Sequence, residues 1–169
     1  MNFVFAIALT SMLILSAYGQ KPKTVCSGAN GLTAAEVTEL LTLQNNARAE
    51  HKLPKLVWDC KLADLAQEWA KRGKFEHRTD TAFGENMFVS SNSQTPVSAA
   101  VHKWMTEKAF WTNKTGVCQT GKTCGHYTQI VWLGTLRVGC GINRNAPGQW
   151  KTLIVCNYDP QGNFPGPAY

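Results

Sequence analysis

Six cysteines, spread from residue 26 to residue 156, constrain this chain more than any other feature of its sequence. An even number of cysteines in an exported protein predicts disulfide bonds. No Cys-x-x-Cys pair is present, which argues against a zinc–cysteine site. Many pairings remain open on sequence alone, although the short loop between residues 118 and 124 is rich in turn residues and can close locally. The cysteines are Cys26, Cys60, Cys118, Cys124, Cys140 and Cys156.

The N-terminus supports export through an oxidising route. Residues 3–15 are apolar apart from two hydroxyl residues, and the small residues Ala17 and Gly19 precede a polar run. This pattern predicts a signal peptide over residues 1–19, cleaved after Gly19, and therefore a secreted, extracellular protein. The alternative is a membrane anchor, but the apolar run is shorter than the roughly 20 residues that span a bilayer. We expect the mature chain not to span a membrane.

Length and charge narrow the class further. Residues 20–169 have the usual length of one domain, and we expect one monomeric unit with one core. Seventeen Lys and Arg against eleven Asp and Glu give a net charge of +6, which favours acidic surfaces as partners. The basic residues are scattered and no nucleic-acid motif accompanies them, so a nucleic-acid partner is not expected.

Two helices are indicated by their N-terminal caps. Thr33 and Glu36 form a capping-box pattern, which predicts a helix over about residues 34–48. Asp59 can cap a second helix, which carries its apolar residues on one face and stops at Gly73.

A third helix and the strands follow. Pro96 opens the helix, whose apolar stripe ends at Trp104. Residues 137–142 and 150–158 are β-prone runs that predict an antiparallel hairpin, and a short strand is expected at residues 86–89. Helices followed by strands indicate an α+β layered domain with helices packed on a small antiparallel sheet. The last ten residues, 160–169, hold three prolines and two glycines, which predicts an extended tail.

Several segments together resemble one known family. Gly84-Glu85-Asn86-Met87, the run from Cys124 to Trp132, Val138-Gly139-Cys140-Gly141 and the run from Val155 to Asn163 resemble, in order, the motifs of the CAP superfamily. This superfamily comprises cysteine-rich secretory proteins, antigen 5 and pathogenesis-related 1 proteins. The resemblance covers almost the whole mature chain and implies a three-layer α-β-α sandwich.

The resemblance also implies a cleft lined by His77, Glu85, Glu107 and His126. Two imidazoles and two carboxylates suit Zn²⁺ or another borderline divalent cation. The residues themselves leave alternatives open, because the four lie on separate segments and form no compact zinc motif. Glu107 can be a solvated helix residue, although it lies at the edge of the apolar stripe, and His126 can be a buried histidine that holds backbone groups.

Disulfide pairing is likewise implied by the family. The chain lacks two cysteines that plant members carry, and Cys26 and Cys60 resemble those of animal and venom members. The resemblance implies the pairs Cys26 with Cys60, Cys118 with Cys124, and Cys140 with Cys156.

The resemblance implies a protein that acts by binding, in defence or host interaction. Sterol or another lipid is one expected ligand, because Phe110 and Trp111 lie where some members have an aromatic sterol-binding loop; ordinary core packing is the alternative. A second hypothesis is a metal-assisted hydrolase, because two histidines beside two carboxylates can exchange protons or activate a metal-bound water. No nucleophile is tied to this set, and no catalytic residue is assigned.

A third reading is a precursor whose C-terminal peptide is released near Asp159-Pro160, as the family resemblance implies; a tail pinned across the surface is the alternative. Asn113-Lys114-Thr115 is the one N-glycosylation sequon of the chain and predicts a glycan on Asn113. His51 and His102 are expected to be exposed and outside any site.

Overall fold

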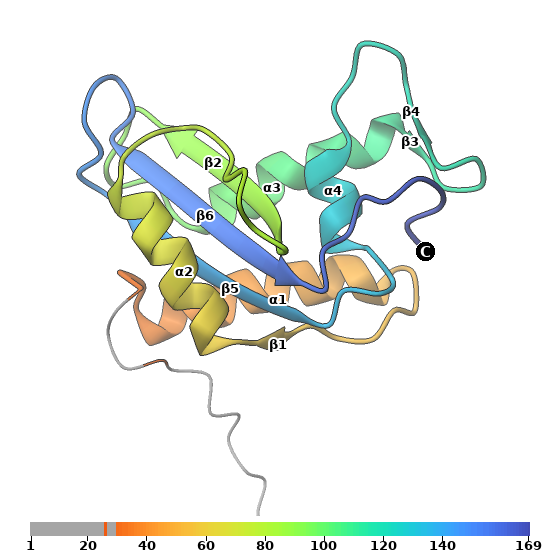
Figure 1. Ribbon diagram of the computed structural model, residues 1–169, viewed down its shortest axis with the longest axis horizontal. Helices are drawn as coiled ribbons and strands as arrows, with labels where there is room; N and C mark the ends of the chain where they lie inside the picture. Colours follow the sequence, from red (N-terminus) through yellow and green to blue (C-terminus); the bar gives the residue numbers. More distant parts are fainter. Residues whose placement is uncertain (1–25, 27–29) are drawn as a thin grey trace, which may run out of the picture.

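The computed structural model describes Cys26 and residues 30–169 (Figure 1). The predicted signal peptide, residues 1–19, lies outside the described residues. Among those described, no helix is both long enough and apolar enough to cross a bilayer.

The predicted caps begin the first two helices. The Thr33 hydroxyl accepts the Glu36 amide while the Glu36 carboxylate accepts the Thr33 amide, so the capping box is confirmed. Asp59 accepts the amides of Lys61 and Leu62 at the second helix. The helices are α1 (Ala34–Ala49), α2 (Cys60–Lys71), α3 (Ser98–Met105), the 3₁₀ helix η1 (Thr106–Phe110) and α4 (Gly125–Ile130).

A four-stranded sheet runs in the order β1-β5-β6-β2. The expected hairpin is confirmed as β5 (Arg137–Asn143) and β6 (Thr152–Asp159), and the expected short strand extends to β2 (Gly84–Ser90). The structure adds β1 (Val57–Trp58), which pairs in parallel with β5, so the sheet is mixed at one edge. A separate two-stranded sheet joins β3 (Trp111–Thr112) and β4 (Val117–Cys118).

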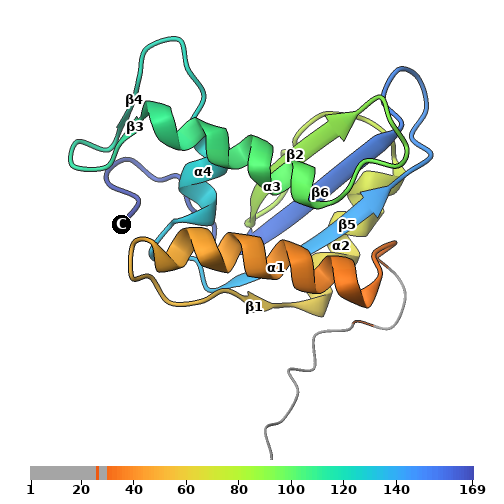
Figure 2. The same cartoon turned by 180° about the vertical axis from the view of Figure 1, so that it is seen from behind.

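The helices cover both faces of the four-stranded sheet. Helix α2 packs across β5 and β6 on one face (Figure 1), while α1, α3 and α4 pack on the other (Figure 2). The protein is therefore a three-layer α-β-α sandwich, as the sequence resemblance implied.

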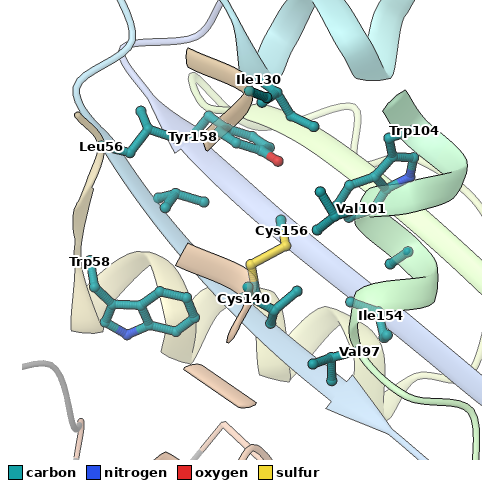
Figure 3. Close-up of a cluster of buried hydrophobic side chains, with 14 of the residues drawn as sticks. Leu56, Trp58, Val97, Val101, Trp104, Ile130, Cys140, Ile154, Cys156 and Tyr158 are labelled. Carbon is teal, nitrogen blue, oxygen red and sulfur yellow. A yellow bond between two sulfur atoms is a disulfide. The ribbon is translucent and has the colours of Figure 1, made fainter. Parts of the chain in front are cut away.

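Three disulfides join the segments, and they are the pairs that the resemblance implied. Cys140 and Cys156 face each other across β5 and β6, and the bond between them is surrounded by apolar side chains such as Val101 and Ile154 (Figure 3). Cys26 is joined to the first residue of α2, and Cys118 to the residue before α4. The described residues contain no free cysteine.

Candidate functional site

The first of two histidine–glutamate pairs lies beside strand β2. His77, in the segment between α2 and β2, places Nδ1 2.7 Å from Glu85 Oε1, and the same oxygen accepts the Arg78 amide at 3.3 Å. The histidine side chain is 62% exposed, whereas that of Glu85 is only 5% exposed. The hydrogen bond to Glu85 raises the pKa of His77, with partial burial opposing it.

The second pair joins η1 to the start of α4. His126 Nδ1 lies 2.6 Å from Glu107 Oε1, and Glu107 Oε2 accepts the amides of His126 at 2.9 Å and Tyr127 at 3.2 Å. The Trp104 ring stacks on the His126 ring, with centroids 6.0 Å apart. Glu107 is thus a positioning residue: one oxygen orients the imidazole, and the other satisfies the open amides of α4.

Asn86 links the two pairs. It follows Glu85 on β2, and its side chain donates to the His126 carbonyl at 3.0 Å and to the Tyr158 hydroxyl at 3.2 Å. Asn86 therefore connects β2, which carries Glu85, to the backbone of His126. Each histidine uses Nδ1 for a carboxylate, which leaves Nε2 as its free ring nitrogen.

The structure brings the four predicted side chains together as two pairs. Among the described residues no group of three or more His, Cys, Asp and Glu side chains is close enough to hold a metal ion. The glutamates are used as partners of the histidines, the arrangement in which a carboxylate orients a metal-binding imidazole. The second oxygen of Glu85, Oε2, is buried and has no hydrogen-bond partner in the described part of the chain.

A cavity of about 210 Å³ opens beside the second pair. Met87, Phe88 and Val89 of β2 give it an apolar lining, and Glu107 and His126 are among its polar lining residues. His77 and Glu85 are not among its lining residues, so the cavity adjoins only one of the two pairs.

A larger cavity of about 400 Å³ lies by the predicted lipid-binding residues. Trp111 lines it together with Trp132 and Phe164, two aromatic residues whose role the sequence did not indicate. Phe110 does not line it; its ring lies 4.9 Å from the ammonium nitrogen of Lys122. The structure therefore separates the two residues that the sequence grouped.

The two histidines that are expected to be exposed differ from each other in the structure. His102 is exposed, as expected. His51 is partly buried, which corrects the expectation: its Nε2 lies 2.9 Å from the Tyr127 hydroxyl and its ring stacks on Tyr169 at 3.8 Å. Burial lowers the pKa of His51, the nearby Lys108 ammonium lowers it further, and Glu50 partly offsets both. No local pattern could have revealed these contacts, because Tyr127 and Tyr169 lie far along the chain.

The structure is thus a disulfide-bonded α-β-α sandwich that carries two histidine–glutamate pairs. The model of the family described as "CAP: Cysteine-rich secretory protein family" matches residues 41–158. The chain belongs to this family.

Plant proteins are among its relatives. Pathogenesis-related leaf protein 4 of Solanum lycopersicum is 34% identical over 165 residues, which cover 97% of this chain and 96% of that protein. Pathogenesis-related protein PR-1 of Medicago truncatula is 40% identical over 132 residues, 76% of this chain and 75% of its own length.

Solved structures share the fold. The structure titled "Crystal structure of NaASP2 with Zn2+" superposes with a TM-score of 0.69 at 27% identity, over 82% of this chain and 86% of that one. Na-ASP-1 superposes with a TM-score of 0.74 at 23% identity, over 85% of this chain and 43% of that chain.

Proposed function

We propose that this chain is a secreted, defence-related CAP protein that acts by binding. Its similarity to pathogenesis-related proteins over nearly its whole length supports the defence role. The disulfides and the predicted signal peptide support secretion into an oxidising compartment.

The proposed ligand of the paired histidines is Zn²⁺ or a similar divalent cation. The observation that carries this proposal is that Nδ1 of His77 and Nδ1 of His126 are each hydrogen-bonded to a glutamate. The glutamate fixes the orientation of each ring and leaves its Nε2 free to bind a metal ion. A zinc-containing relative of the same fold supports it. Imidazole nitrogen is a preferred ligand of Zn²⁺, and the two histidines would supply two of its ligands, with the further coordination positions open to water or an external ligand. A cation bound there would supply a Lewis acid.

Zinc titration by calorimetry tests this proposal. His77→Ala and His126→Ala should each weaken zinc binding by at least about tenfold, because each removes one of the two proposed imidazole ligands. His102→Ala is the matched control, since His102 is exposed and lies outside both pairs. Unchanged zinc affinity in the double His77→Ala, His126→Ala variant would refute the proposal, as would an equal loss in the control.

A second proposed ligand is sterol or another lipid, bound in the 400 Å³ cavity. Its volume is in the range of small-molecule sites, and the indole of Trp111 and the rings of Trp132 and Phe164 offer apolar surface. The structure favours Trp111 over Phe110 as a contact residue.

The two aromatic residues therefore provide a matched pair of variants. Trp111→Ala should reduce binding of a radiolabelled sterol by about tenfold, because burying one large aromatic side chain against a ligand is worth over 1 kcal/mol. Phe110→Ala should leave sterol binding near the wild-type value. An equal effect of both variants would mean that the cavity is not the binding site.

A further inference from the structure

The sequon asparagine, Asn113, holds the last residues of the chain. Its Oδ1 accepts the amides of Ala168 at 2.8 Å and Tyr169 at 3.2 Å, and also the Trp111 indole N–H at 3.2 Å. Its Nδ2 donates to the backbone oxygen of Tyr169. Every polar atom of this side chain is therefore engaged inside the fold, and both of its ends contact Tyr169.

The rest of the tail is docked in the same region. The Leu133 amide donates to the Ala168 carbonyl at 2.7 Å, and Ala168 is only 2% exposed. Tyr169 stacks on His51, and its hydroxyl lies 3.2 Å from that of Tyr127. In Figures 1 and 2 the segment after β6 passes α4 and ends near β3 and β4. Asn113 lies in the turn between these two strands, and its side chain forms hydrogen bonds with Ala168 and Tyr169 of the tail.

The amide geometry makes this contact sensitive to modification. Nδ2 of a side-chain amide carries two hydrogens, and only one of them lies on the same side of the C–N bond as Oδ1. When Oδ1 and Nδ2 both contact one residue, this is the hydrogen that Nδ2 donates. In an N-substituted amide the substituent occupies that same side, because the trans arrangement is strongly preferred over the cis one. A sugar on Nδ2 would therefore stand where Tyr169 now lies.

We propose that N-glycosylation of Asn113 and docking of residues 164–169 exclude each other, so that an occupied sequon releases this end of the chain. In the transfer, Nδ2 bonds to the anomeric carbon of a sugar carried on a lipid pyrophosphate, loses one proton, and the lipid pyrophosphate leaves. Release uncovers His51 and Tyr127, and it removes the wall that Phe164, Pro165 and Gly166 give to the 400 Å³ cavity. This inference is independent of the zinc proposal.

Amide hydrogen exchange followed by NMR tests it, on protein from a glycosylating host with Asn113 occupancy measured by mass spectrometry. Thr115→Ala is the matched variant, because it destroys the sequon but keeps the asparagine. In Thr115→Ala the amides of Ala168 and Tyr169 should be protected. In Asn113→Ala they should exchange about tenfold faster, because their acceptor is gone, while core amides such as Val155 stay protected.

Wild-type protein completes the test. Glycosylated molecules should show fast exchange of the Ala168 and Tyr169 amides. Unglycosylated molecules should show the same protection of these amides as Thr115→Ala. Wild-type protein that carries no glycan and has protected amides agrees with the proposal. Glycosylated molecules with protected amides would overturn it. Fast exchange in Thr115→Ala would also overturn it, because the tail would then be undocked without any glycan.

Discussion

The Glu107 carboxylate contacts both the His126 ring and the first backbone amides of α4. The residue before α4, Cys124, makes no side-chain cap, so the amides of His126 and Tyr127 depend on the Glu107 carboxylate. The same carboxylate holds the His126 ring. Orientation of the histidine and formation of α4 are therefore coupled through one residue, which explains why an acid at the edge of an apolar stripe has a partner.

His51 is expected to make stability depend on pH in the weakly acidic range. Its pKa is lowered in the folded protein, so the unfolded chain takes up the proton first as pH falls through the ordinary value of 6.5. The stabilising contribution is complete above that value and is lost as pH falls below it. His51→Gln should therefore lose less stability than wild type between about pH 7.5 and about pH 5.5, measured as the urea midpoint.

The charged and titratable groups around His51 define the control for this experiment. Lys108 lowers and Glu50 raises its pKa, while Tyr127 and Tyr169 contact its ring. His102→Gln changes an exposed histidine outside this cluster and should keep the wild-type pH profile. The prediction fails if the profile of His51→Gln matches that of wild type.

At the scale of elements, the close packing of α2 on the sheet depends on two glycines of β5. A Cβ on Gly139 would lie 2.2 Å from the Ala63 nitrogen, and one on Gly141 would lie 2.4 Å from the Gln67 nitrogen. Both neighbours are helix backbone, which cannot move aside as a flexible side chain can. Helix and strand therefore approach at a distance that only glycine permits.

Gly139→Ala should lower the free energy of unfolding by about 3 kcal/mol, because the added methyl group forces α2 away from β5. Gly134→Ala is the control: its Cβ would find its nearest neighbours at 3.7 Å, an ordinary contact with the Trp132 side chain. That variant should stay within about 0.5 kcal/mol of wild type. Urea denaturation measures both, and similar midpoints for the two variants would contradict the packing argument.

Across the whole molecule, Arg48 ties α1 to the segment after α4. Its guanidinium donates to the carbonyls of Pro54, Ile130, Trp132 and Thr135, and the residue is fully buried. Burial lowers its pKa to about 10, and the nearby Tyr158 partly offsets this effect. Arg48 is thus a buried charged residue that connects segments distant along the chain.

Local features of the chain could be predicted because their causes act over a few residues. The capping box at Thr33, the Asp59 cap and the β-prone runs that became β5 and β6 all depend on near neighbours. Short elements without such signals, including β1 and the β3–β4 pair, were not predicted, because their pairing partners decide them.

From the sequence alone, three helices, the β5–β6 hairpin and the strand β2 could be predicted, and the family motifs and candidate site residues could be named. How those residues combine depends on folding: two histidine–glutamate pairs form, Trp111 lines a cavity that Phe110 does not line, and Asn113 is hydrogen-bonded to Tyr169. Each of these outcomes depends on contacts between segments that are distant along the chain. Such contacts form only when the layers pack, and no local periodicity or cap encodes them.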